Sequence, residues 1–179
     1  MVNIVIYKDK AMKLEKLIGD LLRERGWTVS IAESCTGGLV CDRITDVPGS
    51  SRYFEGGMVN YSNESKEKHL GVPLDDITRY GAVSSHVAKK MAQGVRKTFN
   101  TTFGLSTTGV AGPTGGTREK PVGLVFIGLT KGKRTWVMKL NLDGSRREIK
   151  IKATEKALQF FYGRIAHSGR LRKQTSPKK

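Results

Sequence analysis

Apolar side chains recur along this chain with two alternating spacings. Over residues 12–25, leucine and isoleucine return every three or four positions, which places them on one face of a helix. Gly26 stands where such a helix ends, and residues 27–32 (WTVSIA) then predict a strand. The chain therefore begins its regular structure with a helix followed by a strand.

The later segments continue this alternation. The pattern predicts four further helices, one that follows Gly38 and runs to 46, one over 63–70, one from the N-cap Ser84 to about 99, and one over 145–162. It predicts four further strands, over 54–61, 103–108, 122–130 and 134–140. Strands that alternate with helices are typical of one α/β domain. The last two strands form a hairpin around residues 131–133, so we expect a mixed sheet.

Composition agrees with one globular domain of the α/β class. The 179 residues are 37% apolar and 27% charged, and the longest apolar run, 122–129, is far shorter than the roughly 20 residues of a membrane span. The first ten residues do not follow the order of a secretory signal. Cys35 and Cys41 suit a reduced thiol pair, so we expect a cytoplasmic protein without a membrane partner. With three histidines and two cysteines, no metal site is expected.

Positive charge is concentrated near the C-terminus. Residues 131–179 hold 15 Lys and Arg residues against three acids, so they carry +12 of the net charge of +16. The tail over 166–179 is predicted to be basic and flexible, and such a tail is either simply solvated or a contact for nucleic acid or another polyanion.

The turn over residues 33–38 is the first candidate for chemistry. Ser34 lies between a predicted strand and a predicted helix, whose free backbone N–H groups favour negative charge. Gly37 and Gly38 let a substrate approach the backbone closely. The turn is consistent with an acyl-transfer nucleophile beside an oxyanion hole, with a phosphate cradle, or with a tightly capped helix start.

A serine nucleophile needs a base. The three histidines, at 69, 86 and 167, are scattered and show no pairing with an aspartate. Lys66 can act instead if burial lowers its pKa, and Tyr61 is close enough in sequence to orient the amine or relay the proton. Lys66 also stands in a charged run, 64–68, in which most lysines are solvated.

The glycine-rich loop over 109–116 follows a predicted strand. Its backbone is suited to a phosphate or a ribose, but it lacks the Gly-Lys-Ser/Thr of a nucleotide-hydrolysing P-loop. Arg146 and Arg147 stand at the start of the predicted last helix and are either phosphate ligands or surface charges.

Six short motifs occur in an order that resembles one family. They are Ala32-Glu-Ser-Cys-Thr-Gly-Gly38, Pro48-Gly-Ser-Ser51, Tyr61-Ser-Asn63 with Lys66, Gly81-Ala-Val-Ser84, Gly109-Val-Ala-Gly-Pro113 and Lys120-Pro-Val-Gly123. Together they closely resemble the C-terminal domain of the competence-damage-inducible protein CinA, whose stand-alone form is a nicotinamide-nucleotide amidase. The resemblance covers about 12–162. We divide the chain into an extension, 1–11, an amidase-like domain, 12–165, and the tail, 166–179.

The resemblance implies a fold and a reaction. It implies a three-layer α/β/α domain that self-associates, and the hydrolysis of nicotinamide mononucleotide to nicotinate mononucleotide and ammonia without a cofactor. Ser34 matches the family's nucleophile, and Tyr61 with Lys66 matches its general-base pair. The remaining matched positions imply substrate contacts, through Thr36, Gly37 and Gly38 at the oxyanion, Thr108, Gly109 and Arg146 at the ribose and phosphate, and Gly49 and Ser51 elsewhere in the site.

Departures from the family pattern and the basic tail leave a second function open. Thr114 stands where the family commonly has aspartate, and Lys150 where it prefers arginine. Residues 2–7 could add an edge strand or a subunit contact. The alternative to the amidase is an inactive binding module of the same fold that contacts nucleic acid or a protein through residues 131–179.

Overall fold

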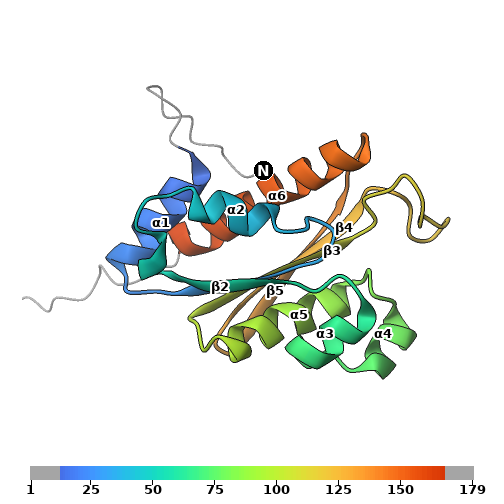
Figure 1. Ribbon diagram of the computed structural model, residues 1–179, viewed down its shortest axis with the longest axis horizontal. Coiled ribbons are helices and arrows are strands. Elements are labelled where there is room, and N and C mark those ends of the chain that lie inside the picture. The colour runs from blue at the N-terminus through green and yellow to red at the C-terminus, as the bar shows by residue number, and fades with distance from the viewer. Residues whose placement is uncertain (1–12, 168–179) are drawn as a thin grey trace, which may run out of the picture.

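A mixed five-stranded sheet is the centre of the computed structural model, which describes residues 13–167 (Figure 1). The strands, in their order across the sheet, are β2 (Phe54–Val59), β1 (Val29–Glu33), β3 (Phe103–Gly109), β4 (Leu124–Lys131) and β5 (Arg134–Asn141). The first three are parallel to one another, and β4 and β5 form the predicted antiparallel hairpin. The prediction of a mixed sheet is confirmed.

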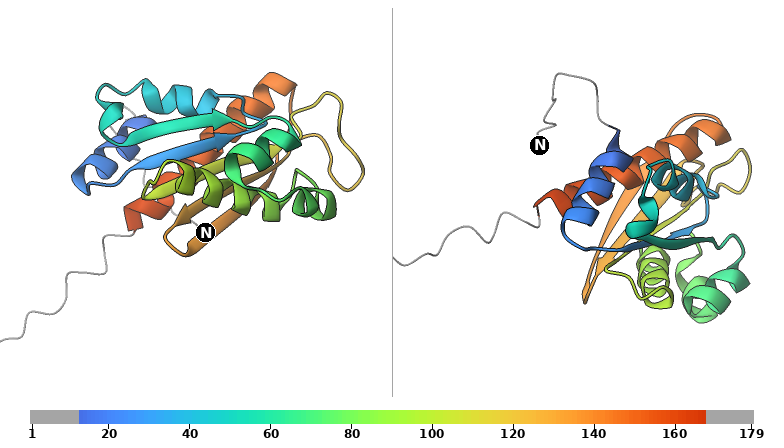
Figure 2. Two further views of the ribbon diagram at one scale, coloured as in Figure 1. Left: turned by 60° about the horizontal axis from the view of Figure 1, so that its bottom comes forward. Right: turned by 60° about the vertical axis from the view of Figure 1, so that its left-hand side comes forward.

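Helices cover both faces of this sheet. One layer consists of α1 (Leu14–Glu24), α2 (Leu39–Thr45) and α6 (Arg146–His167), and the other of α3 (Asn63–Leu70), α4 (Leu74–Tyr80) and α5 (Ser85–Thr98). The right-hand view of Figure 2 shows the two layers on opposite sides of the strands. Both layers bury apolar faces against the strands, so the expected three-layer α/β/α fold is confirmed.

Most boundaries agree with the sequence pattern, and the differences have local causes. Ser62 and Ser84 are the N-cap residues of α3 and α5, and their side chains accept hydrogen bonds from backbone N–H groups of the first helical turn. Strand β1 begins two residues later than predicted, because the Trp27 N–H donates to the Leu22 carbonyl at 2.9 Å and the Thr28 N–H to Thr102 Oγ1 at 3.1 Å instead of to a neighbouring strand. Helix α4 was not predicted, since it is short and Ile77 is its one buried residue.

The parallel strands end at one edge of the sheet. Glu33, the last residue of β1, pairs with Val59 of β2 on one side and with Thr107 of β3 on the other. The segments that follow these three strands therefore leave the sheet side by side. This edge, called the carboxyl edge below, receives the turn after β1, the entry to α3 and the glycine-rich loop.

Two predicted features lie outside the described residues. These are the possible strand over 2–7 and the part of the basic tail from 168 onward. Helix α6 extends to His167, which is five residues beyond its predicted end. None of the helices between residues 13 and 167 combines the length and the apolar composition that crossing a membrane requires.

Two helical glycines allow a test of the packing of α5 against α3 within one layer. A methyl group on Gly94 of α5 would overlap the backbone carbonyl of Leu70, whereas one on Gly163 of α6 would meet no atom within 4 Å. We expect Gly94→Ala to lower the free energy of unfolding by about 1–3 kcal/mol. Gly163→Ala, the matched control, should leave it unchanged or raise it by up to about 1 kcal/mol. Urea denaturation of both variants measures the difference, and equal effects would contradict this packing.

Candidate active site

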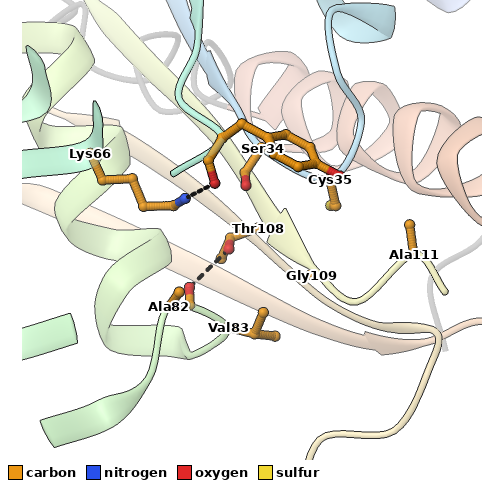
Figure 3. Close-up of a pocket in the computed structure, with 9 residues that line it drawn as sticks. Ser34, Cys35, Lys66, Ala82, Val83, Thr108, Gly109 and Ala111 are labelled. Carbon is orange, nitrogen blue, oxygen red and sulfur yellow. Dashed lines mark hydrogen bonds between the residues drawn. The ribbon is translucent and has the colours of Figure 1, made fainter. Parts of the chain in front are cut away.

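A cavity of about 180 Å³ opens at the carboxyl edge (Figure 3). Four segments supply its lining: the turn after β1, the start of α3, the residues between α4 and α5, and the end of β3 with the loop that follows. The lining residues are Ser34, Cys35, Tyr61, Lys66, Ala82, Val83, Thr108, Gly109 and Ala111. The predicted nucleophile and the predicted base therefore line the same cavity.

The turn after β1 holds Ser34 in a fixed position. The Ser34 backbone N–H donates to the Thr107 carbonyl at 3.0 Å, which extends the β1–β3 pairing by one residue. Gly37 and Gly38 then adopt φ values of 63° and 99°, in the left-handed region that favours glycine. These two residues reverse the chain into α2, so that Ser34 stays at the mouth of the sheet with 8% of its surface exposed.

Lys66 reaches the cavity from α3 and is 1% exposed. Its Nζ donates to the carbonyls of Tyr61, at 3.0 Å, and Ser62, at 3.3 Å. Figure 3 shows the extended side chain directed toward Ser34. No carboxylate forms an ion pair with Lys66 in the described part of the chain. The residue is thus a buried amine held by neutral carbonyl groups.

The surroundings of Lys66 favour the uncharged amine. Burial is the largest influence and lowers the pKa of Lys66 below its ordinary value of 10.5, while Cys35 and Glu64 act weakly in the opposite direction. A neutral amine has two hydrogens and one lone pair. Because the two carbonyls accept the two hydrogens, the lone pair is left to accept a proton.

Tyr61 differs from the expected partner of the base. Its main-chain carbonyl, and not its phenol, contacts Lys66. Tyr61 is 59% exposed, and its phenol oxygen accepts a hydrogen bond from Arg146 Nη2 at 2.7 Å. Arg146 also donates from Nη1 to the Gly112 carbonyl at 2.7 Å. Arg146 therefore joins Tyr61 to the glycine-rich loop beside the cavity.

The other predicted contacts divide into three groups. Thr108 and Gly109 line the cavity, and Thr108 Oγ1 donates to the Ala82 carbonyl at 2.9 Å. Thr36 is not among the lining residues, and its side chain is buried behind the turn, where the hydroxyl donates to Glu33. Gly49 and Ser51 precede β2, whose first residue pairs with the first residue of β1, so they lie at the opposite end of the sheet from Ser34. Within one chain, these two residues cannot join the site.

Sequence reasoning missed several lining residues and one contact between a histidine and an aspartate. Cys35, Ala82, Val83 and Ala111 belong to motifs quoted above, so their membership of those motifs was the available signal. A His–Asp pair, not foreseen, joins His86 to Asp76 at 2.9 Å between α5 and α4. The pair does not line the cavity and offers no base to Ser34.

Cys35 lies next to Ser34 but is unsuited to act as a nucleophile. Burial, the largest influence, raises the pKa of its thiol to about 12. Because the thiolate is the reactive form of cysteine, the side chain is an apolar wall at neutral pH. Of these two adjacent side chains, the hydroxyl of Ser34 is therefore the candidate nucleophile.

The fold and the cavity define a CinA-type α/β/α domain with a serine and a buried lysine at its carboxyl edge. The model of the CinA C-terminal domain family matches residues 11–165, and the chain belongs to this family. It is 51% identical, over 145 residues, to a competence-damage inducible protein of Desulforudis audaxviator, and 50% identical, over 156 residues, to a CinA-like protein of Dictyoglomus thermophilum. The matched regions cover 81% and 87% of this chain but only 35% and 38% of those proteins.

Solved structures share the whole architecture. Competence damage-inducible protein A of Klebsiella pneumoniae superposes with a TM-score of 0.84 at 26% identity, covering 87% of this chain and 96% of that one. The competence/damage inducible protein CihA of Agrobacterium tumefaciens gives a TM-score of 0.79 at 33% identity, covering 89% and 98%. This chain thus corresponds to nearly all of each of these two solved chains.

The buried amine makes stability depend on pH in a defined direction. The unfolded chain keeps Lys66 protonated up to about its ordinary pKa of 10.5, whereas the folded chain releases that proton at lower pH. The free energy of unfolding therefore gains a contribution that grows as pH rises between the lowered pKa and 10.5. Lys66→Met should lack this gain, so its stability relative to the natural chain falls between pH 7 and pH 10. Denaturant titrations at several pH values measure the free energy of unfolding of both proteins. Lys68→Met, at an exposed position of α3, is the control. If the free energy of unfolding changes with pH in the same way in all three proteins, the burial of the Lys66 amine is contradicted.

Proposed function

We propose that this protein is an amidohydrolase that converts nicotinamide mononucleotide and water to nicotinate mononucleotide and ammonia. The observation that carries the proposal is the presence of Ser34 and the carbonyl-held amine of Lys66 in one cavity. A hydroxyl beside an uncharged amine is suited to acyl transfer, because the amine accepts the proton that the hydroxyl loses on attack. The substrate comes from the family resemblance.

The reaction proceeds in two halves. Lys66 Nζ accepts the Ser34 Oγ proton while Oγ attacks the carboxamide carbon, and the protonated amine then returns the proton to the leaving nitrogen, which departs as ammonia. In the second half, water loses a proton to Lys66 and attacks the acyl carbon. The ester bond breaks, and the Ser34 oxygen regains a proton from Lys66. The lysine is thus base and acid in turn, and no other proton carrier is required.

The turn after β1 supports the oxyanion that forms in both halves. The Gly38 N–H donates to Glu33 and the Ser34 N–H donates to Thr107, so neither is free for the substrate. In the described chain, the N–H groups of Thr36 and Gly37 hold no hydrogen bond. These two are the donors that we assign to the oxyanion, in place of the wider set that the sequence predicted.

The shape and charge of the cavity suit one end of a mononucleotide. Ala82, Val83 and Ala111 form an apolar wall for a flat ring, while the volume is too small to enclose a whole nucleotide. The phosphate would therefore lie at the rim, where Arg146 is held by Tyr61 and Gly112. Lys150 adds a second cation, because its Nζ lies 3.2 Å from the position of a methyl group built on Gly37.

The alternative of an inactive binding module rests on the charge of +12 in residues 131–179, which include the basic tail over 166–179. Most of that tail lies outside the described residues, and no observation between residues 13 and 167 favours the module over the enzyme. Self-association and a cytoplasmic location, which the resemblance and the composition implied, stay predictions.

Turnover provides the direct test. The purified protein should release ammonia and nicotinate mononucleotide from nicotinamide mononucleotide, as measured by a coupled ammonia assay and by chromatography of the product. Ser34→Ala should lower the rate by at least about a thousandfold, because the acyl-enzyme cannot form. Ser85→Ala, at an exposed position of α5, is the matched control and should retain full activity. The proposal fails if the folded protein shows no turnover or if Ser34→Ala turns over normally.

The position of the Tyr61 phenol allows a second test of the mechanism. Because the phenol binds Arg146 and not Lys66, Tyr61→Phe should raise the KM for the mononucleotide by about three- to tenfold, the value of one hydrogen bond. Its kcat should change by less than about threefold. Steady-state kinetics of Tyr61→Phe and Lys66→Met measure the contrast. If Tyr61→Phe lowers kcat as much as Lys66→Met does, the phenol acts together with Lys66 as the general base, and this assignment of Tyr61 to Arg146 is wrong.

A further inference from the structure

A buried acid lies directly behind the turn that carries Ser34. Glu33 is the last residue of β1 and has no exposed surface. It pairs with Thr107 of β3, and paired residues of neighbouring strands point to the same face of a sheet. Its carboxylate meets the start of α2, so it points away from the α3–α5 layer. The cavity and this carboxylate are therefore separated by the Ser34 turn.

Three donors converge on the Glu33 carboxylate. Oε2 accepts from the Gly38 N–H at 2.9 Å and from Thr36 Oγ1 at 2.5 Å, and Oε1 accepts from the Cys41 N–H at 2.8 Å. Thr36 Oγ1 also lies 2.7 Å from Thr107 Oγ1. Since the Thr36 hydrogen goes to the carboxylate, the Thr107 hydroxyl donates to Thr36. The acid thus binds the turn through both a side chain and the backbone.

Both carboxylate oxygens of Glu33 accept hydrogen bonds from backbone N–H groups, which can only donate. A carboxylate without a proton matches these donors, because both of its oxygens can only accept. No lysine or arginine forms an ion pair with Glu33 among residues 13–167. The partners of the carboxylate are the N–H groups at the start of α2, where the helix dipole favours negative charge. The arrangement is a buried cap for α2 that uses an acid from the preceding strand.

We infer that Glu33 is a positioning residue for the reaction at Ser34, acting through the turn over 34–38. The inference rests on the proposed function. Thr36 and Gly37, the assigned oxyanion donors, lie in the segment between Glu33 and Gly38, and the Glu33 carboxylate holds this segment through Thr36 Oγ1 and the Gly38 N–H. Withdrawing the carboxylate releases the turn, so the N–H groups lose their fixed direction toward the oxyanion while the apolar wall that binds the ring stays in place.

Glu33→Gln is the sharpest variant. The amide has nearly the shape of the carboxylate, but its NH₂ group must face either the Cys41 N–H or the Gly38 N–H, where donor meets donor. We expect kcat to fall about a hundredfold and KM to change by less than about threefold. Glu15→Gln is the matched control, because Glu15 is also a buried acid but pairs with Arg43 of α2, outside the cavity lining. It should keep kcat within about twofold of the natural chain.

Thr36 supplies a second pair of variants in case Glu33→Gln does not fold. Thr36→Val keeps the shape and removes the hydroxyl that joins Glu33 to Thr107, so it should lower kcat by about tenfold. Thr36→Ser keeps the hydroxyl and should restore most of that loss. A residue that only stabilised the fold would not produce this rescue in kcat once the folded fractions are matched by circular dichroism.

A second readout separates this inference from the proposed function. Phenylmethylsulfonyl fluoride sulfonylates an activated serine without any need for the natural substrate, and mass spectrometry of the intact protein measures the rate at Ser34. If the natural chain is labelled but does not turn over the mononucleotide, the substrate proposal alone fails. Slower labelling in Glu33→Gln with unchanged labelling in Glu15→Gln supports the positioning role. Equal labelling rates in Glu33→Gln and the natural chain, or equal losses in both variants, would overturn it.

Discussion

The parallel pairing of β1 with both β2 and β3 is the constraint on which this structure depends. Glu33 pairs with Val59 on one side and Thr107 on the other, so three chain segments leave the sheet at one edge. These segments carry Ser34, Lys66 and Thr108, which are separated by up to 74 positions in sequence but line one cavity. Two of the three strands are central, which buries them on both faces and makes the edge rigid.

Desolvation is the physical basis of the chemistry that we propose for this edge. The ammonium form of Lys66 is stabilised by a counter-charge, but among residues 13–167 its Nζ forms no ion pair and donates to the carbonyls of Tyr61 and Ser62. The layer that buries the amine, α3 against α5, therefore favours its uncharged form at the cost of folding stability. Strained or desolvated groups of this kind are expected where a protein carries out chemistry, because a fully solvated lysine would stay protonated.

Much of the fold could be predicted from the sequence because its signals are local. The serines before α3 and α5 cap their helices, and the apolar spacing of α1 marks its buried face, so these elements were located within one or two residues. Helix α4 was missed because a short helix with one buried residue has no periodicity to detect.

The candidate site residues could be predicted from the motifs, but the positions of these residues relative to one another could not. The ordered motifs placed Gly49 and Ser51 with the site, although they precede β2 and so lie at the other end of the sheet.

The sequence by itself determined the class of domain, the family, and the serine and lysine that the proposed chemistry requires, since these depend on residue type, spacing and order. Only the tertiary structure decided what each polar group binds. It directs the Tyr61 phenol to Arg146 and the Tyr61 carbonyl to Lys66, and it commits the Gly38 N–H to the Glu33 carboxylate. The reason is physical: hydrogen-bond partners and burial are set by segments far apart in the chain, and neither is encoded in the spacing of a motif.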